Sequence, residues 1–171
     1  MKRIVLFAII VFLSQKSYCQ SAWEFFTMGS DKADQNNYKG AIIDYGKAIE
    51  LDSKLYLAFF YRGWAKNQLK DYRGAIPDFT RCIELLDPSE KDLLAEVYNS
   101  RGTAKSDIKD YLGAITDFTK AIQYNKLPGT YYNRGLAKIS NKQKESGCLD
   151  LSKAGELGYP DAYEAIQDLC N

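Results

Sequence analysis

The chain has 171 residues, of which 46% are apolar and 26% are charged, a composition typical of a globular domain rather than a disordered chain. Lysine and arginine together number 23 against 22 acidic residues, and this net charge of +1 does not support bulk binding to nucleic acid. The chain contains no histidine, which excludes Ser-His and Cys-His catalysis, histidine-ligated metals and histidine-based pH switching.

Residues 1–19 have the features of a secretory signal peptide. Lys2 and Arg3 precede an apolar run from Ile4 to Leu13, and a polar segment follows. At about 1.5 Å per residue this run spans about 15 Å, roughly half of a bilayer core, so we do not expect a permanent transmembrane helix. We expect cleavage after Cys19, which removes three basic residues and no acidic one and leaves a mature net charge of −2.

Lipidation of Cys19 is the alternative interpretation of this leader. Bacterial lipoprotein signals usually have a Leu three residues before the cysteine and a small residue directly before it. Lys16 and Tyr18 occupy those positions here, and the bulky tyrosine fits poorly. We therefore favour cleavage and export, to the periplasm or the cell surface, over anchoring as an outer-membrane lipoprotein.

One short sequence motif occurs three times in the remaining chain. It reads Tyr-x-Gly-Ala-Ile, followed by an Asp, an aromatic residue and a Lys/Arg–Ala/Cys–Ile triplet, and the copies begin at Tyr38, Tyr72 and Tyr111. A glycine lies upstream of each copy, and a degenerate fourth copy follows, so that the glycines are spaced by 34, 39 and 33 residues. These glycines are Gly29, Gly63, Gly102 and Gly135.

This pattern resembles the tetratricopeptide repeat (TPR), a helix-turn-helix unit of about 34 residues. The resemblance implies an all-α fold, a right-handed superhelical solenoid of antiparallel helix pairs, in which small residues such as Gly63 and Ala75 let paired helices approach closely. Phe79 would fill the space beside them. The resemblance places the repeats at about 22–55, 56–89, 95–127 and 128–158.

The end of the chain predicts one further helix. Gly158 suits a helix stop and Pro160 a helix start, so we expect a capping helix over about 160–170 that covers the last apolar face of the solenoid. The four-residue spacing of the small residues Ala154, Gly158 and Ala162 also resembles the Sel1-like relatives of the TPR family. The leader, the closing cysteine and the repeat subtype resemble secreted proteins of Gram-negative bacteria, especially Bacteroidetes.

Cys148 and Cys170 straddle the predicted hairpin. They lie ten and twelve residues from Gly158, and helical arms of about 15 and 18 Å bring them level. In an exported protein we expect a disulfide between them, the alternative being two separate buried thiols. Cys82 occupies a small-residue core position where sister repeats have Ala, which predicts a buried thiol rather than a nucleophile.

Arginines and aspartates recur in register with the repeats. An arginine precedes three of the glycines, and an aspartate opens each Asp-aromatic or Asp-Leu pair. These charges predict structural ion pairs between packed helices, formed either within a repeat or between one repeat and the next, and counting leaves both schemes open. The residues are Arg62, Arg101 and Arg134 with Asp44, Asp78, Asp117 and Asp150.

The resemblance also implies that the first helix of each repeat lines a concave groove. A chaperone-binding subclass of the family holds C-terminal carboxylates there with basic and Asn residues, but Phe26, Ser30, Tyr61, Glu96 and Ser100 do not reproduce that set. We expect instead an aromatic and amide-bearing surface that binds a partner. Its candidate residues are Trp23, Phe26, Phe60, Trp64, Asn67, Asn99 and Tyr132.

The sequence therefore predicts an exported protein-binding scaffold that holds a peptide or partner helix in its groove. The alternative is a structural subunit of an envelope complex that uses its ends or convex face. No phosphate loop, dinucleotide fingerprint or metal-spaced cysteine cluster occurs, so we expect no enzymatic activity, no cofactor, no metal site and no nucleic-acid partner. The oligomeric state is open.

Overall fold

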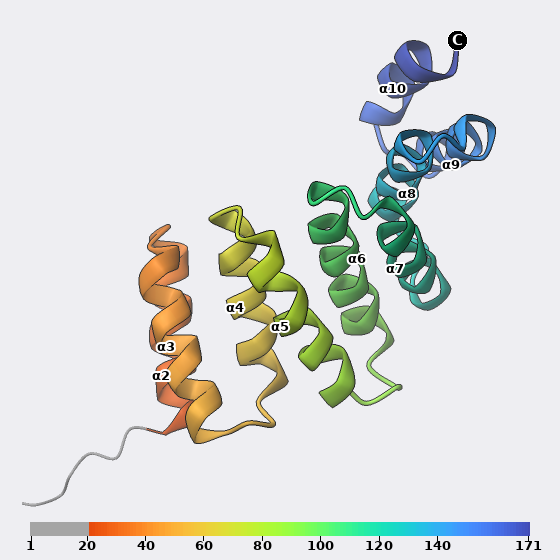
Figure 1. The fold of residues 1–171 in the computed structure, drawn as a ribbon. Coiled ribbons are helices and arrows are strands. Elements are labelled where there is room, and N and C mark those ends of the chain that lie inside the picture. Colours follow the sequence, from red (N-terminus) through yellow and green to blue (C-terminus); the bar gives the residue numbers. More distant parts are fainter. Residues whose placement is uncertain (1–20) are drawn as a thin grey trace, which may run out of the picture.

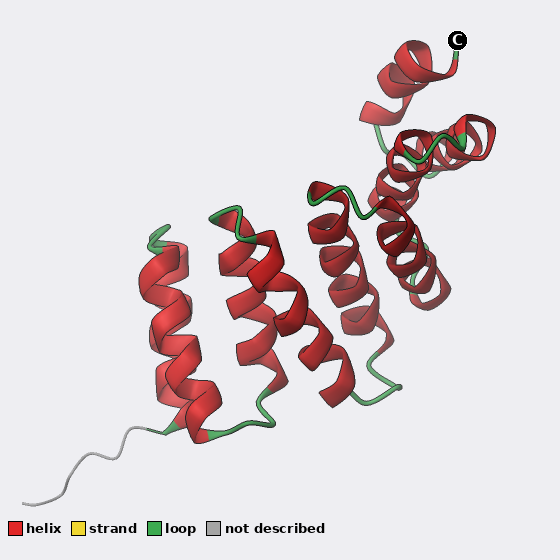
Figure 2. Cartoon of the chain, in the orientation of Figure 1, coloured by secondary structure: helices red, strands yellow, loops and turns green. Residues whose placement is uncertain are grey.

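A computed structural model describes residues 21–171, and this part of the chain forms nine helices and no strand (Figures 1 and 2). The predicted signal peptide and Cys19 lie outside the described residues. The all-α solenoid is confirmed. The helices are α2 (Ala22–Asp34), α3 (Tyr38–Leu51), α4 (Tyr56–Gln68), α5 (Tyr72–Leu85), α6 (Lys91–Asp107), α7 (Tyr111–Tyr124), α8 (Pro128–Ser140), α9 (Lys144–Glu156) and α10 (Asp161–Cys170).

The helices pack as four antiparallel pairs and a single terminal helix (Figure 1). In each pair the first helix contacts its own second helix most extensively, and each second helix then contacts the first helix of the next pair. Contacts also join α2 to α4, α4 to α6 and α6 to α8. The first helices therefore lie side by side along the inner face of the solenoid. No helix within residues 21–171 combines the length and apolar character needed to cross a bilayer.

A repeated turn joins the two helices of each pair. One residue of each turn has a positive φ, at Asn36, Lys70, Lys109 and Lys142. In the first three pairs, the residue after this positive-φ position caps the second helix. Its side chain accepts a hydrogen bond from the glycine amide of the Tyr-x-Gly motif. A Cβ at Gly74 would lie 2.1 Å from the capping Asp71 carboxylate, which explains the glycine at this position.

The upstream glycines make room for the large buried side chains. A Cβ at Gly63 would lie 2.9 Å from the Phe79 ring, and one at Gly102 would lie 2.8 Å from Phe118. Phe79 and Phe118 are essentially inaccessible to solvent. In the fourth pair, Gly135 and Gly147 meet backbone to backbone, so both faces of that contact need a residue without a side chain.

The last helix pair is tied to α10. A disulfide joins Cys148 to Cys170, as the sequence predicts, and the Tyr163 hydroxyl donates to the Gly155 carbonyl at 3.1 Å. Ala162 is the buried residue of α10, which packs against α9. Cys82 is a buried free thiol in α5, and burial raises its pKa to about 12. It therefore lacks the thiolate character of a nucleophile.

Candidate functional site

Buried aspartates organise the charges of the inner helices. Arg101 donates two hydrogen bonds to Asp117, at 2.9 and 2.7 Å, and the same fork joins Arg62 to Asp78 and Arg134 to Asp150. Each pair lies within one repeat, which decides between the two schemes that the sequence leaves open. Each guanidinium also lies over an aromatic ring three residues earlier, as Arg101 does over Tyr98 at 5.3 Å.

A lysine one turn after each arginine binds the same carboxylate, a contact that is not among the sequence-based predictions. Lys66 lies 2.7 Å from Asp78, Lys105 lies 2.8 Å from Asp117, and Lys138 lies 2.7 Å from Asp150. In the first pair Lys32 binds Asp44, while Met28 stands at the position of the arginine. The spacing of four residues between Arg and Lys was the available signal, because it places both cations on one helix face.

These contacts occupy nearly all of the positive charge on the first helices. Of the eight cations on α2, α4, α6 and α8, all but Lys91 at the start of α6 pair with a buried aspartate. A charge-paired lysine or arginine that is largely buried has little capacity left for an external anion. The inner face therefore presents other groups to a ligand.

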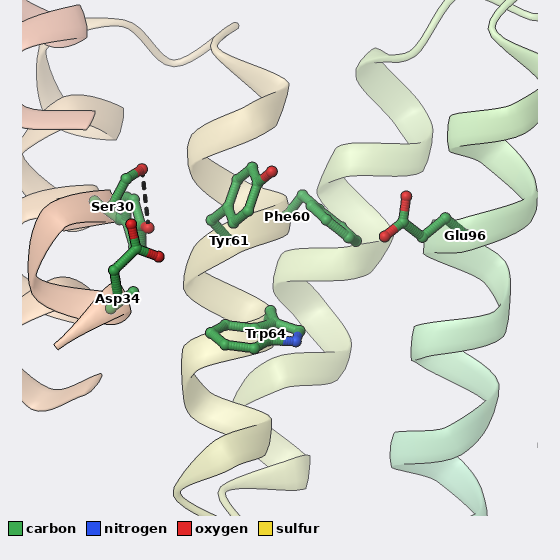
Figure 3. Close-up of a pocket in the computed structure, with 8 residues that line it drawn as sticks. Ser30, Asp34, Phe60, Tyr61, Trp64 and Glu96 are labelled. Carbon is green, nitrogen blue, oxygen red and sulfur yellow. Dashed lines mark hydrogen bonds between the residues drawn. The ribbon is translucent and has the colours of Figure 1, made fainter. Parts of the chain in front are cut away.

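A pocket of about 160 Å³ opens between α2, α4 and α6 (Figure 3). Phe60, Tyr61 and Trp64 of α4 form its aromatic wall. Asp34 of α2 lies on one side of this wall and Glu96 of α6 on the other, as Figure 3 shows. We call this cavity the aromatic pocket.

The aromatic pocket is the centre of a row of rings. Trp23 contacts Phe26 with ring centroids 4.9 Å apart, Phe26 contacts Tyr61 at 5.6 Å, and Tyr61 contacts Phe60 at 5.2 Å. Trp23 is 54% exposed and Tyr61 38%, whereas Phe60 is only 5% exposed. The exposed rings can contact a partner, while Phe60 mainly supports the wall from within the core.

The structure brings some of the predicted groove residues together and separates others. Phe60 and Trp64 line the aromatic pocket, and Trp23 joins it through the buried Phe26. Asn67 follows Trp64 by one turn on α4, and its buried Oδ1 makes no hydrogen bond among the described residues. Tyr61 is not among the predicted groove residues, but it follows Phe60 directly on α4 and also lines the aromatic pocket.

The other two predicted residues lie further along the inner face. Asn133 Nδ2 donates to Asn99 Oδ1 at 3.4 Å, and Asn133 lines a second pocket of about 180 Å³ between α6 and α8. Tyr132 packs on Tyr159 with centroids 4.7 Å apart and lines a third pocket, of about 330 Å³, between α8 and α10. The predicted residues thus contribute to a groove with several pockets rather than to one patch.

Comparisons with known proteins agree with this architecture. A tetratricopeptide repeat family model matches residues 95–126. A crystal structure of MamA protein is 22% identical, with a TM-score of 0.77, over 85% of this chain and 78% of that one. MamA from Desulfovibrio magneticus RS-1 is 18% identical, with a TM-score of 0.73, over 80% of this chain and 75% of that one.

A third similar structure contains a ligand. The first TPR of Spaghetti (RPAP3), bound to the HSP90 peptide SRMEEVD, is 18% identical, with a TM-score of 0.59, over 78% of this chain and 94% of that one. Comparison with curated protein sequences finds no significant match. At these identities the likeness shows the fold: residues 21–171 form a TPR-type solenoid, with a tetratricopeptide repeat at 95–126.

Proposed function

We propose that this chain is a scaffold that binds a peptide or a helix of a partner protein in the groove along its first helices. The aromatic pocket is the observation that carries this proposal. It combines exposed rings with a hollow of about 160 Å³, which suits an apolar side chain of a bound segment.

Ser30 beside the rings can accept a hydrogen bond from a peptide N–H, because its own hydroxyl proton is donated to the Phe26 carbonyl at 3.2 Å. Ser30 and Tyr45 line the aromatic pocket, and the Tyr45 hydroxyl donates to Ser30 Oγ at 3.3 Å. Burial raises the pKa of Tyr45, so this hydroxyl stays protonated in the neutral pH range. The peptide complex of the Spaghetti TPR is an independent precedent for a segment bound by this fold.

The test is selection of binding peptides from an unbiased source. Phage-displayed random 12-residue peptides are selected on immobilised residues 20–171, and the dissociation constants of synthetic copies are measured by fluorescence anisotropy. Tyr61→Ala should weaken binding at least about tenfold, because hot-spot aromatic residues contribute at least that much. Leu149→Ala, an exposed change on α9 outside the three pockets, is the matched control.

Peptides that bind equally well to Tyr61→Ala, or recovery of no peptide at all, would reject the groove as the binding site. Circular dichroism of both variants shows that each is folded. If only Leu149→Ala lowers the affinity, the binding site lies on the outer face. That result would support the alternative of an envelope subunit.

We further infer that the protein works outside the cytoplasm. The pattern of residues 1–19 and the Cys148–Cys170 disulfide support this, since structural disulfides persist in oxidising compartments. The intact mass of protein isolated from its native cells tests it. A mature chain that begins at Gln20 is expected; an uncleaved chain, or a lipid on Cys19, would contradict cleavage after Cys19.

A further inference from the structure

The three pockets of the inner face contain negative charge and no positive charge. Two carboxylates line the aromatic pocket, one lines the pocket between α6 and α8, and three line the pocket between α8 and α10. No lysine or arginine lines any of them. The six carboxylates are Asp34, Glu96, Asp107, Asp161, Glu164 and Asp168.

None of the six takes part in an ion pair within residues 21–171. The cations that could neutralise them are held by the buried aspartates instead, as Lys105 is by Asp117. The groove is thus negative because each repeat uses its own positive charges internally. A cleft lined by one sign of charge concentrates ligands of the opposite sign.

The six carboxylates are exposed to solvent, and two groups in the second and third pockets have raised pKa values. Burial raises the pKa of the Asp107 carboxyl, which has no cation beside it. Tyr132 also has a raised pKa, first through burial and further through Tyr159, Asp161 and Glu164.

The carboxylates are spread along the groove rather than gathered. No three acidic or cysteine side chains of residues 21–171 converge closely enough to hold a metal ion. Figure 3 shows Asp34 and Glu96 on opposite sides of the aromatic wall, so the pocket offers an apolar centre with a negative charge at each edge. Spaced negative charges and rings suit an extended ligand with several cations.

We infer that the partner segment is cationic: a lysine- or arginine-rich peptide or amphipathic helix whose apolar side chain enters the aromatic pocket. This rests on the proposed function and adds the charge of the ligand to it. Lysine or arginine beside the pocket can pair with Asp34 or Glu96 and also lie over the exposed Tyr61 ring. The peptide in the Spaghetti TPR complex, SRMEEVD, has the opposite character, with three acidic residues and one basic residue.

The random-peptide selection described above tests the charge directly. Peptides whose binding depends on Tyr61 should have a net positive charge. Raising the salt concentration from about 0.05 to 0.5 M should lower their affinity at least severalfold. Synthetic SRMEEVD is the acidic control and should show no binding at the same concentrations. Groove-bound peptides that are neutral or acidic would overturn this inference and leave the proposed function intact.

A charge-matched pair of variants completes the test. Asp34→Asn with Glu96→Gln should lower the affinity of a selected peptide about tenfold, the effect of losing two ion pairs beside an apolar contact. Glu50→Gln with Glu84→Gln changes the net charge equally at exposed sites on α3 and α5, outside the pockets. Equal losses in both double variants would mean that only the overall charge matters, and would reject the assignment to these two carboxylates.

Discussion

Arg101 donates a hydrogen bond of 3.0 Å to the Thr80 hydroxyl, across the boundary between the second and third helix pairs. Arg134 and Thr119 form the same bond, at 3.1 Å, across the next boundary. At the first boundary the residue opposite Arg62 is Gly46, where an added Cβ would lie 3.8 Å from Nη1. The first boundary therefore lacks a hydrogen bond that the two later boundaries have.

Gly46→Thr should supply this bond. A Cβ at this position makes no close contact, and threonine has a higher helix propensity than glycine. We expect the free energy of unfolding in urea to rise by about 1 kcal/mol. Valine has the shape of threonine without the hydroxyl, so Gly46→Val is the control. An equal rise in the free energy of unfolding for both variants would contradict a contribution from the hydrogen bond.

Gly63→Ala should have the opposite effect, although alanine favours helix. Its Cβ would lie 2.9 Å from the Phe79 ring, so α4 and α5 must separate or the ring must move. We expect a loss of about 1–3 kcal/mol in the free energy of unfolding, measured by urea denaturation. Gly46→Ala is the matched helical control and should be stabilising; a neutral Gly63→Ala would show that the core can relax.

Asp117→Asn should destabilise the chain more than Asp44→Asn does. Asp117 is bound by both Arg101 and Lys105, and its replacement leaves two largely buried cations without a counter-charge. Asp44 is bound closely only by the more exposed Lys32, with Lys47 at 4.0 Å. We expect thermal unfolding to show a loss of about 3 kcal/mol for Asp117→Asn. Equal losses for the two variants would mean that the second cation contributes nothing.

Loss of the disulfide should loosen the C-terminal end first. The Cys148–Cys170 bond closes a loop of 22 residues, which corresponds to about 3 kcal/mol in the chain-entropy model. In Cys148→Ser with Cys170→Ser, amide exchange should accelerate in α10 and α9, while α4 and α5 should keep their protection. Faster exchange that begins in α2 instead would contradict this order.

Cys82 should make stability fall at high pH. Its pKa is about 12 in the folded chain and near 9.0 when exposed, so the unfolded chain releases this proton first as pH rises. Stability is therefore lost between about pH 9 and pH 12. Cys82→Ala, which copies the residue of the sister repeats, should lose less stability over this range. Parallel urea curves for both proteins at pH 8 and pH 10.5 check this, and an identical pH dependence would reject it.

The repeat register made most of the fold predictable. Recurrent residues such as Gly63 and Phe79 have one structural role in every copy, so each copy supports the interpretation of the others. The Cys148–Cys170 pair was predictable because helix rise alone brings the two residues level.

The candidate site was less predictable, because it depends on which side chains are buried or paired within the fold and which stay available to a partner. Phe60 and Trp64 share the predicted groove-facing register, but Phe60 is almost fully buried. The negative groove could not be derived by counting charges, since the chain is nearly neutral overall. It arises because pairs such as Lys66 with Asp78 hide the positive charges, which only three-dimensional contacts reveal.

The missing bond at Gly46 also affects the mechanics of the solenoid. In a linear array each joint couples only two neighbours, so the stiffness of a joint depends on the contacts that cross it. The aromatic pocket spans that joint, with Asp34 on one side and Tyr61 on the other. A bound segment that contacts both residues would stiffen the N-terminal helix pair against the next pair. Among the three boundaries between helix pairs in residues 21–171, this is the one without an arginine–threonine hydrogen bond.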